Sequence, residues 1–166
     1  MTDFSIGYTM ISGTIPTEIT QWENLRTLDL ANAALTGTIP EELYLAQFRD
    51  LEALVFSQNF FTGTISTLVG QLDSIDSLYY SLNPFLEGTV PTELGNLTGL
   101  SKIHLHGSGF TGSIPAELCS LRQNSNLTVL KADCSADTNT GVIPTPCAAG
   151  CCTKCCEPNT GYCIDV

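Results

Sequence analysis

The sequence has little positive charge, no long apolar run and no cysteine in its first 118 residues. Its 166 residues contain 6 Lys and Arg against 17 Asp and Glu, a net charge of -11. Such a charge repels phosphate backbones and anionic lipid surfaces, so we expect no nucleic-acid partner. No stretch approaches the roughly 20 consecutive apolar residues that span a bilayer, and no basic and apolar leader opens the chain. The sequence therefore predicts neither a membrane span nor a signal peptide in this chain.

Recognisable catalytic motifs are also missing. The chain contains no Gly-x-Ser-x-Gly, no His-Glu-x-x-His and no phosphate-binding loop. We therefore predict a protein that is not an enzyme and that uses no cofactor. With 43% hydrophobic and 14% charged residues, the chain has enough apolar side chains for one compact domain or one repeat array, and it lies outside the disordered class.

The most frequent feature of the sequence is a short block, Gly-x-Ile-Pro or a close variant. The block occurs six times, beginning at Gly13, Gly37, Gly63, Gly88, Gly112 and Gly141. Successive glycines are 24, 26, 25, 24 and 29 residues apart. This period lies within the range of about 20 to 29 residues that is typical of leucine-rich repeats, and it is shorter than that of helical-pair or propeller repeats.

Upstream of each block, apolar residues two apart predict a short strand whose alternate side chains face a core. The inward pairs are Leu28 and Leu30, Leu54 and Phe56, Leu78 and Tyr80, Ile103 and Leu105, and Leu130 and Ala132, with Phe4 and Ile6 at the start. One such strand cannot bury its apolar side alone, so neighbouring strands must stack into a parallel sheet. After each Ile-Pro we expect one helical turn with the proline at its first position.

The combined pattern, LxxLxLxxNxLxGxIPxxLxxL, is similar to the plant-type leucine-rich repeat of receptor-kinase ectodomains and polygalacturonase-inhibiting proteins. The resemblance covers about residues 4 to 144. It implies an α/β solenoid, a right-handed superhelix of about six repeats with a parallel β-sheet on the concave face and short helical or 3₁₀ turns on the convex face. It also implies an asparagine ladder at the turn, which only Asn59 and Asn83 match. Ala33, Ser108 and Ser135 occupy this place in other repeats.

We divide the chain into a solenoid over residues 1–145 and a cysteine-rich carboxy-terminal cap over residues 146–166. Counting back from Gly13, we expect the chain to begin within a repeat, without an amino-terminal cap. The eight cysteines are Cys119, Cys134, Cys147, Cys151, Cys152, Cys155, Cys156 and Cys163. An even number crowded at one end favours a disulfide-bonded cap and an oxidising compartment, with the connectivity left open. Structural zinc and redox chemistry are the alternatives, because Cys152 and Cys155 have a two-residue gap.

Two further signals agree with an extracellular or cell-surface location. The cysteine-rich end resembles the ends of leucine-rich-repeat proteins of diatoms, and this resemblance implies secretion or surface display. The triplets that begin at Asn96 and Asn126 have the form of N-glycosylation acceptors.

The outward residues of the predicted strands form columns on the concave face, because equivalent positions of adjacent repeats lie side by side. One column runs Ser5, Asp29, Val55, Tyr79, His104 and Lys131. A mixed patch, the predicted ligand-binding site, gathers at the carboxy-terminal end: Tyr79, Lys102, His104, His106, Lys131 and Asp133. Aromatic and charged groups on a rigid sheet are typical of protein or glycan contacts. A zinc site at His104, His106 and Asp133, or a pH-sensitive contact, is an alternative, but we predict no metal.

These observations predict an extracellular recognition module that binds a protein, peptide or glycan on its concave face. The alternatives are an inhibitor of a secreted cell-wall hydrolase and a structural or adhesive surface protein. A third alternative is ice binding, because Thr14, Thr38, Thr64, Thr89 and Ser113 form a column before the turns that resembles an ice-binding face. Threonine and serine also satisfy turn backbone groups locally, which is the simpler explanation of this column.

Overall fold

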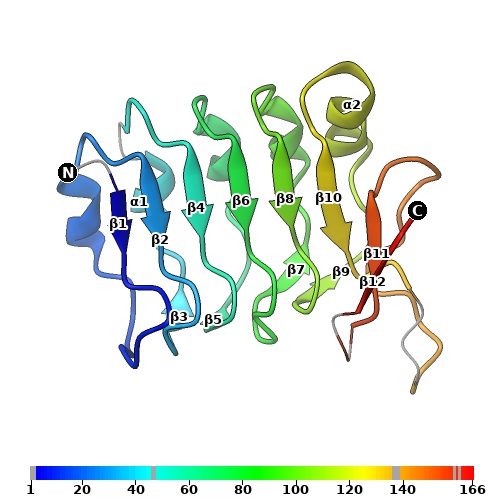
Figure 1. Cartoon of the computed structure of the whole chain (residues 1–166), viewed down its shortest axis with the longest axis horizontal. Coiled ribbons are helices and arrows are strands. Elements are labelled where there is room, and N and C mark those ends of the chain that lie inside the picture. Colours follow the sequence, from blue (N-terminus) through cyan, green and yellow to red (C-terminus); the bar gives the residue numbers. More distant parts are fainter. Residues whose placement is uncertain (1–2, 46–47, 136–138, 159, 161) are drawn as a thin grey trace.

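The computed structural model describes residues 3–45, 48–135, 139–158, 160 and 162–166. Its main sheet has eight strands that stand side by side in chain order (Figure 1). They are β1 (Asp3–Ser5), β2 (Thr27–Asp29), β4 (Ala53–Val55), β6 (Ser77–Tyr79), β8 (Lys102–His104), β10 (Val129–Ala132), β11 (Lys154–Cys156) and β12 (Cys163–Asp165). Neighbours from β1 to β11 are parallel, and only β12 runs antiparallel, against β11.

The core lies behind this sheet and is built from the alternating apolar residues of the strands. Leu28, Leu54, Leu78 and Ile103 are direct partners across neighbouring strands, and each is fully buried. Because side chains alternate along a strand, the residues on either side of them point to the opposite, concave face. The predicted solenoid, its strands and its inward pairs are confirmed.

Short helical segments form the convex side, behind the sheet in Figure 1. They are η1 (Thr17–Gln21), α1 (Glu42–Leu45), η2 (Thr67–Gln71), η3 (Thr92–Asn96) and α2 (Ala116–Asn124). Pro16 and Pro91 precede η1 and η3 with extended ψ angles of 138° and 137°. The predicted first helical position of the proline is therefore wrong by one residue, because the extended run of the Ile-Pro block continues through it. No helix in the described part of the chain is long and apolar enough to cross a membrane.

A second strip of short strands lies beside the turns and was not predicted. It consists of two parallel pairs, β3 (Thr36–Thr38) with β5 (Phe60–Thr62) and β7 (Glu87–Thr89) with β9 (Gly109–Thr111). The glycine of the repeated block is required here for two reasons. Gly88 has a φ of 85°, and a Cβ built on it would lie 2.8 Å from Cγ2 of Thr64 in the preceding repeat. The threonine and glycine columns therefore interlock from one repeat to the next.

The asparagine ladder is present at Asn59 and Asn83, and both side chains are buried. Asn59 Nδ2 donates to the carbonyl oxygens of Leu30 (2.8 Å), Phe56 (3.0 Å) and Ser57 (3.3 Å), and its Oδ1 accepts from the N–H groups of Ala33 (3.2 Å) and Leu35 (2.9 Å). In the repeat that follows Asn83, the hydroxyl of Ser108 accepts from Asn83 N–H and donates to the carbonyl of Tyr80. Ser108 thus takes over part of the asparagine's role.

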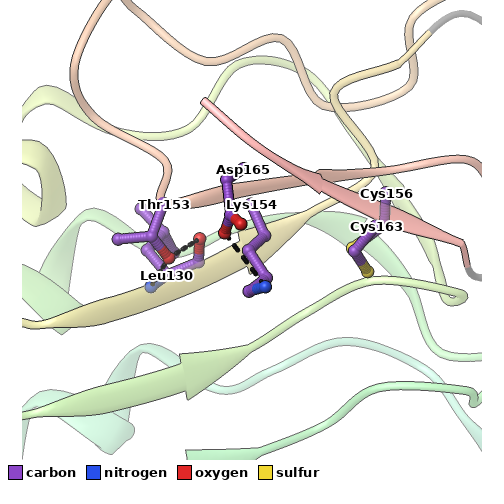
Figure 2. Close-up of polar contacts among 6 residues, drawn as sticks. All are labelled: Leu130, Thr153, Lys154, Cys156, Cys163 and Asp165. Carbon is purple, nitrogen blue, oxygen red and sulfur yellow. Dashed lines mark hydrogen bonds and ion pairs between the residues drawn. A yellow bond between two sulfur atoms is a disulfide. The ribbon is translucent and has the colours of Figure 1, made fainter.

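The carboxy-terminal tail continues the sheet beyond the last repeat. Disulfide bonds join Cys119 to Cys151, Cys134 to Cys155, Cys147 to Cys152 and Cys156 to Cys163. The first two tie α2 and the end of β10 to the tail, and the other two are local. Figure 2 shows Thr153 beside Leu130 of β10, where its hydroxyl accepts from Leu130 N–H (2.9 Å) and donates to the Leu130 carbonyl (3.0 Å). The hairpin of β11 and β12 is therefore part of the sheet rather than a separate appendage.

Candidate ligand-binding face

The strand register places the predicted column of outward residues side by side on the concave face. Ser5, Asp29, Val55, Tyr79, His104 and Lys131 are successive partners across β1, β2, β4, β6, β8 and β10. The structure extends this column by one strand, because Lys154 on β11 is the partner of Lys131. The concave face is thus a regular grid whose chemistry changes along the solenoid.

Four of the six predicted site residues are accessible on this grid. Lys102 is exposed, and Tyr79, His104 and Lys131 are half-buried. The rings of Tyr79 and His104 are 4.7 Å apart between centroids at an interplanar angle of 85°, so the edge of one ring meets the face of the other. Burial, and after it the positive charge of Lys131, lowers the pKa of His104 to about 4. The ring is therefore neutral at neutral pH, and it adds a polar, aromatic surface rather than charge.

The other two predicted site residues, His106 and Asp133, are buried, with 9% and 2% of their surface exposed. Both carboxylate oxygens of Asp133 accept from Gly107 N–H, at 3.0 and 2.8 Å. Burial raises the pKa of Asp133 to about 6, against the opposing effect of backbone hydrogen bonds from Gly107 and Ser108. The hydrogen bonds of Asp133 favour a role in holding the turn after β8, whereas the described residues provide no hydrogen-bond partner for His106 Nδ1. Direct ligand contact by these two residues stays a prediction.

Sequence reasoning missed Lys154 and Asp165, which lie at the carboxy-terminal end of the grid. Lys154 Nζ forms an ion pair with a carboxylate oxygen of Asp165 on β12, at 3.0 Å (Figure 2). The Cys156–Cys163 disulfide lies further along the same hairpin. No signal in the sequence could have placed these residues, because their position depends on the disulfide connectivity that the sequence leaves open.

Possible metal ligands gather in two groups among the described residues. One contains His106, Cys156 and Cys163, the other Cys134, Cys147 and Cys152, with ligand atoms within 4.8 Å of one another. The sulfur atoms of both groups are in disulfide bonds. The alternative zinc site of His104, His106 and Asp133 is not among these groups.

Two other predicted features lie on accessible surface. Asn96, at the end of η3, and Asn126, after α2, are both exposed. Their glycosylation stays a prediction. The threonine column formed by Thr14, Thr38, Thr64, Thr89 and Ser113 is exposed along its whole length.

One strand and one helical segment per turn, with a period of about 25 residues, define a leucine-rich-repeat solenoid. The model of the Leucine Rich Repeat family matches residues 24–45. The chain has the leucine-rich-repeat fold, and its repeats are similar to those of plant receptor-like proteins and receptor ectodomains.

Receptor-like protein 39 of Arabidopsis thaliana is 39% identical over 83 residues, which cover 49% of this chain and 9% of that protein. The chain spans only 9% to 14% of the length of such curated relatives.

Solved structures that are similar over most of the chain include a plant receptor and a plant ice-binding protein. The plant peptide hormone receptor RGFR1, solved in complex with RGF2, is 34% identical with a TM-score of 0.71, and the match covers 78% of this chain and 20% of that one. A plant ice-binding protein is 26% identical with a TM-score of 0.62, and the match covers 74% of this chain and 39% of that one.

Proposed function

We propose that this chain is an extracellular recognition module that binds a peptide segment along its concave face and catalyses no reaction. The observation that carries the proposal is the aligned column of Val55, Tyr79, His104 and Lys131, which presents apolar, aromatic and charged groups on one rigid sheet. Such a mixture is the usual material of a protein contact. The four disulfides support an oxidising, extracellular compartment.

The shape of the grid supports an extended ligand. Ala53, Ser57, Ser77 and Ser81, on β4, β6 and the turns that follow them, are small, and the hydroxyls of Ser57 and Ser81 are 2.9 Å apart. Because these side chains are small, the middle of the concave face is lower than the neighbouring part that Tyr79 and His104 form. An extended peptide crossing several strands can place its side chains between them. RGFR1, the similar receptor, is a receptor for a peptide hormone, which supports a peptide over other ligand classes.

A substitution in the middle of the grid tests this proposal. Ala53 is half-buried on β4 and faces the concave side, so Ala53→Arg should block the path of a peptide without disturbing the core. We expect peptides selected from a random library on the native protein to bind this variant at least about tenfold more weakly, since one well-placed contact residue changes binding by about 1.4 kcal/mol or more.

The matched control is Ala116→Arg, which makes the same change at an exposed position at the start of α2 on the convex side. Equal binding by both variants, or the absence of any selected peptide, would contradict a concave peptide site. Selective inhibition of a cell-wall hydrolase by the native protein would favour the inhibitor alternative, and concentration-dependent self-association would favour the adhesive one.

A second candidate function, ice binding, is favoured by the exposed threonine column and by the similarity to a plant ice-binding protein. The methyl groups of Thr14 and Thr64 lie against the glycines of the next repeats, which holds the column rigid. If the column binds ice, the native protein should inhibit ice recrystallisation, and Thr38→Lys should abolish the effect. Thr27→Lys, which lies on the concave face, should not. Recrystallisation at the buffer rate with native protein would exclude this function.

A further inference from the structure

All three lysines of this acidic chain lie on neighbouring strands of the concave face. The chain has six basic residues, and its lysines are Lys102, Lys131 and Lys154. They lie on β8, β10 and β11. Lys131 and Lys154 are direct partners, and Lys102 is the partner of Val129, two residues before Lys131. Adjacent strands are roughly 4.8 Å apart, so the three ammonium groups can converge on one ligand group.

The lysine cluster, meaning Lys102, Lys131 and Lys154, is a local reversal of charge on a molecule with a net charge of -11. At the other end of the same column stands Asp29, beside Ser5. The positive charge of Lys131 is felt by its surroundings, because it is the largest cause after burial of the lowered pKa values of both His104 and His106. The face thus carries a gradient from acidic to basic along the solenoid.

The acidic groups around the cluster leave its centre open. Asp133 is buried, and both of its carboxylate oxygens already accept from Gly107 N–H. Asp76, near Lys102, accepts a hydrogen bond from the Ser77 hydroxyl at 2.6 Å, which is the main cause of its lowered pKa. The third acid, Asp165, pairs with Lys154. The described residues provide no ion pair for Lys131.

The ion pair at Lys154 shows how a carboxylate sits in this cluster. Asp165 approaches from β12, with 85% of its side chain exposed, and reaches Lys154 Nζ at 3.0 Å. The chain's own carboxylate therefore occupies one side of the cluster. A carboxylate on a peptide that lies along the grid would meet Lys131 and Lys102 in the same manner.

We propose that the lysine cluster, centred on Lys131, anchors the acidic side chains of a peptide whose apolar portion lies over Val55 and Tyr79. This inference rests on the proposed function and adds the chemical class of the ligand and its direction, with the acidic end toward the cysteine-rich tail. Electrostatic complementarity of this kind fixes register and speeds association.

The aromatic residues beside the cluster favour a peptide over an acidic glycan. Tyr79 and His104 meet edge to face at 85°, so the edge of one ring already covers an aromatic face on which a sugar ring could stack. The neighbouring Val55 offers an apolar contact for an amino-acid side chain.

The test uses the native full chain, a random peptide library and a labelled peptide made from the strongest selected sequence. We expect selection on the native protein to enrich Asp and Glu. Lys131→Glu should weaken binding of the labelled peptide at least about tenfold, and replacing the acidic residues of that peptide by Gln or Asn should have a similar effect. Raising the salt concentration should weaken native binding, because the cluster is accessible to solvent.

The matched control is Arg49→Glu, which changes the net charge equally at an exposed position before β4. Binding that falls equally in both variants would reduce the effect to overall charge and overturn the cluster. Selected peptides that lack acidic residues but lose binding in Ala53→Arg would also overturn the cluster, and would leave the proposed function standing. If no peptide is selected at all, both the proposed lysine cluster and the proposed peptide-binding function are wrong. If no acidic peptide is selected and oligogalacturonate binds in a way that depends on Lys131, the ligand is an acidic glycan and the peptide proposal is wrong.

Discussion

Asn59→Ala should destabilise the protein by about 3 to 4 kcal/mol, a large share of the stability of a domain this size. The side chain is 2% exposed and is shared among three carbonyl oxygens and two N–H groups of adjacent turns. Alanine removes all five hydrogen bonds and leaves buried backbone groups without a protein partner. Urea denaturation followed by circular dichroism measures the loss.

Asn24→Ala is the control, because Asn24 is exposed in the loop before β2. Its free energy of unfolding should stay within about 0.5 kcal/mol of the native value. If the two variants unfold at the same urea concentration, Asn59 does not support the turn as described.

Removing the Cys119–Cys151 disulfide should cost more stability than removing the Cys156–Cys163 disulfide. The first bond closes a sequence separation of 32 residues and the second a separation of 7. Chain entropy predicts losses of about 4 and about 2 kcal/mol for the paired cysteine-to-alanine variants. The longer bond also fastens α2 to the tail, where Arg122 Nε donates to the Gly150 carbonyl at 3.0 Å.

Urea denaturation of the two double variants, each compared with the native chain, checks this order. A larger loss for Cys156→Ala with Cys163→Ala would mean that the terminal hairpin, rather than the tie to α2, holds the last repeat in place. Loss of cooperative unfolding in either variant would show that the tail separates from the repeats before they unfold.

The repeats could be predicted from the sequence because their apolar residues recur at a regular spacing. Leu28, Leu54 and Leu78 recur at a spacing that fixes both the face and the neighbour of each strand, so the columns of the concave face follow from counting. The sheet register agrees with those columns at every strand from β1 to β10.

The tail could not be predicted, because nothing in it repeats. The position of Lys154 beside Lys131 depends on which cysteines pair, and eight cysteines allow many pairings. The burial of His106 and Asp133 has a similar origin. Alternation along the strands predicts that both lie on the concave side, but whether they are exposed to solvent depends on the turn after β8 and on the hairpin beside it. Periodicity predicts the position of a residue in the sheet but not whether neighbouring loops bury it.

The reversed direction of β12 has a consequence for assembly. A solenoid that ends on a parallel strand offers a template on which the first strand of another copy can continue the sheet, and repeated addition would build a filament. Here the last strand runs antiparallel to β11, is three residues long and carries the 85% exposed Asp165. An incoming β1 would meet the wrong hydrogen-bond pattern, and its own Asp3 would approach a like charge. The short, charged hairpin therefore disfavours the addition of a second copy as a continuation of the repeats at this edge of the sheet.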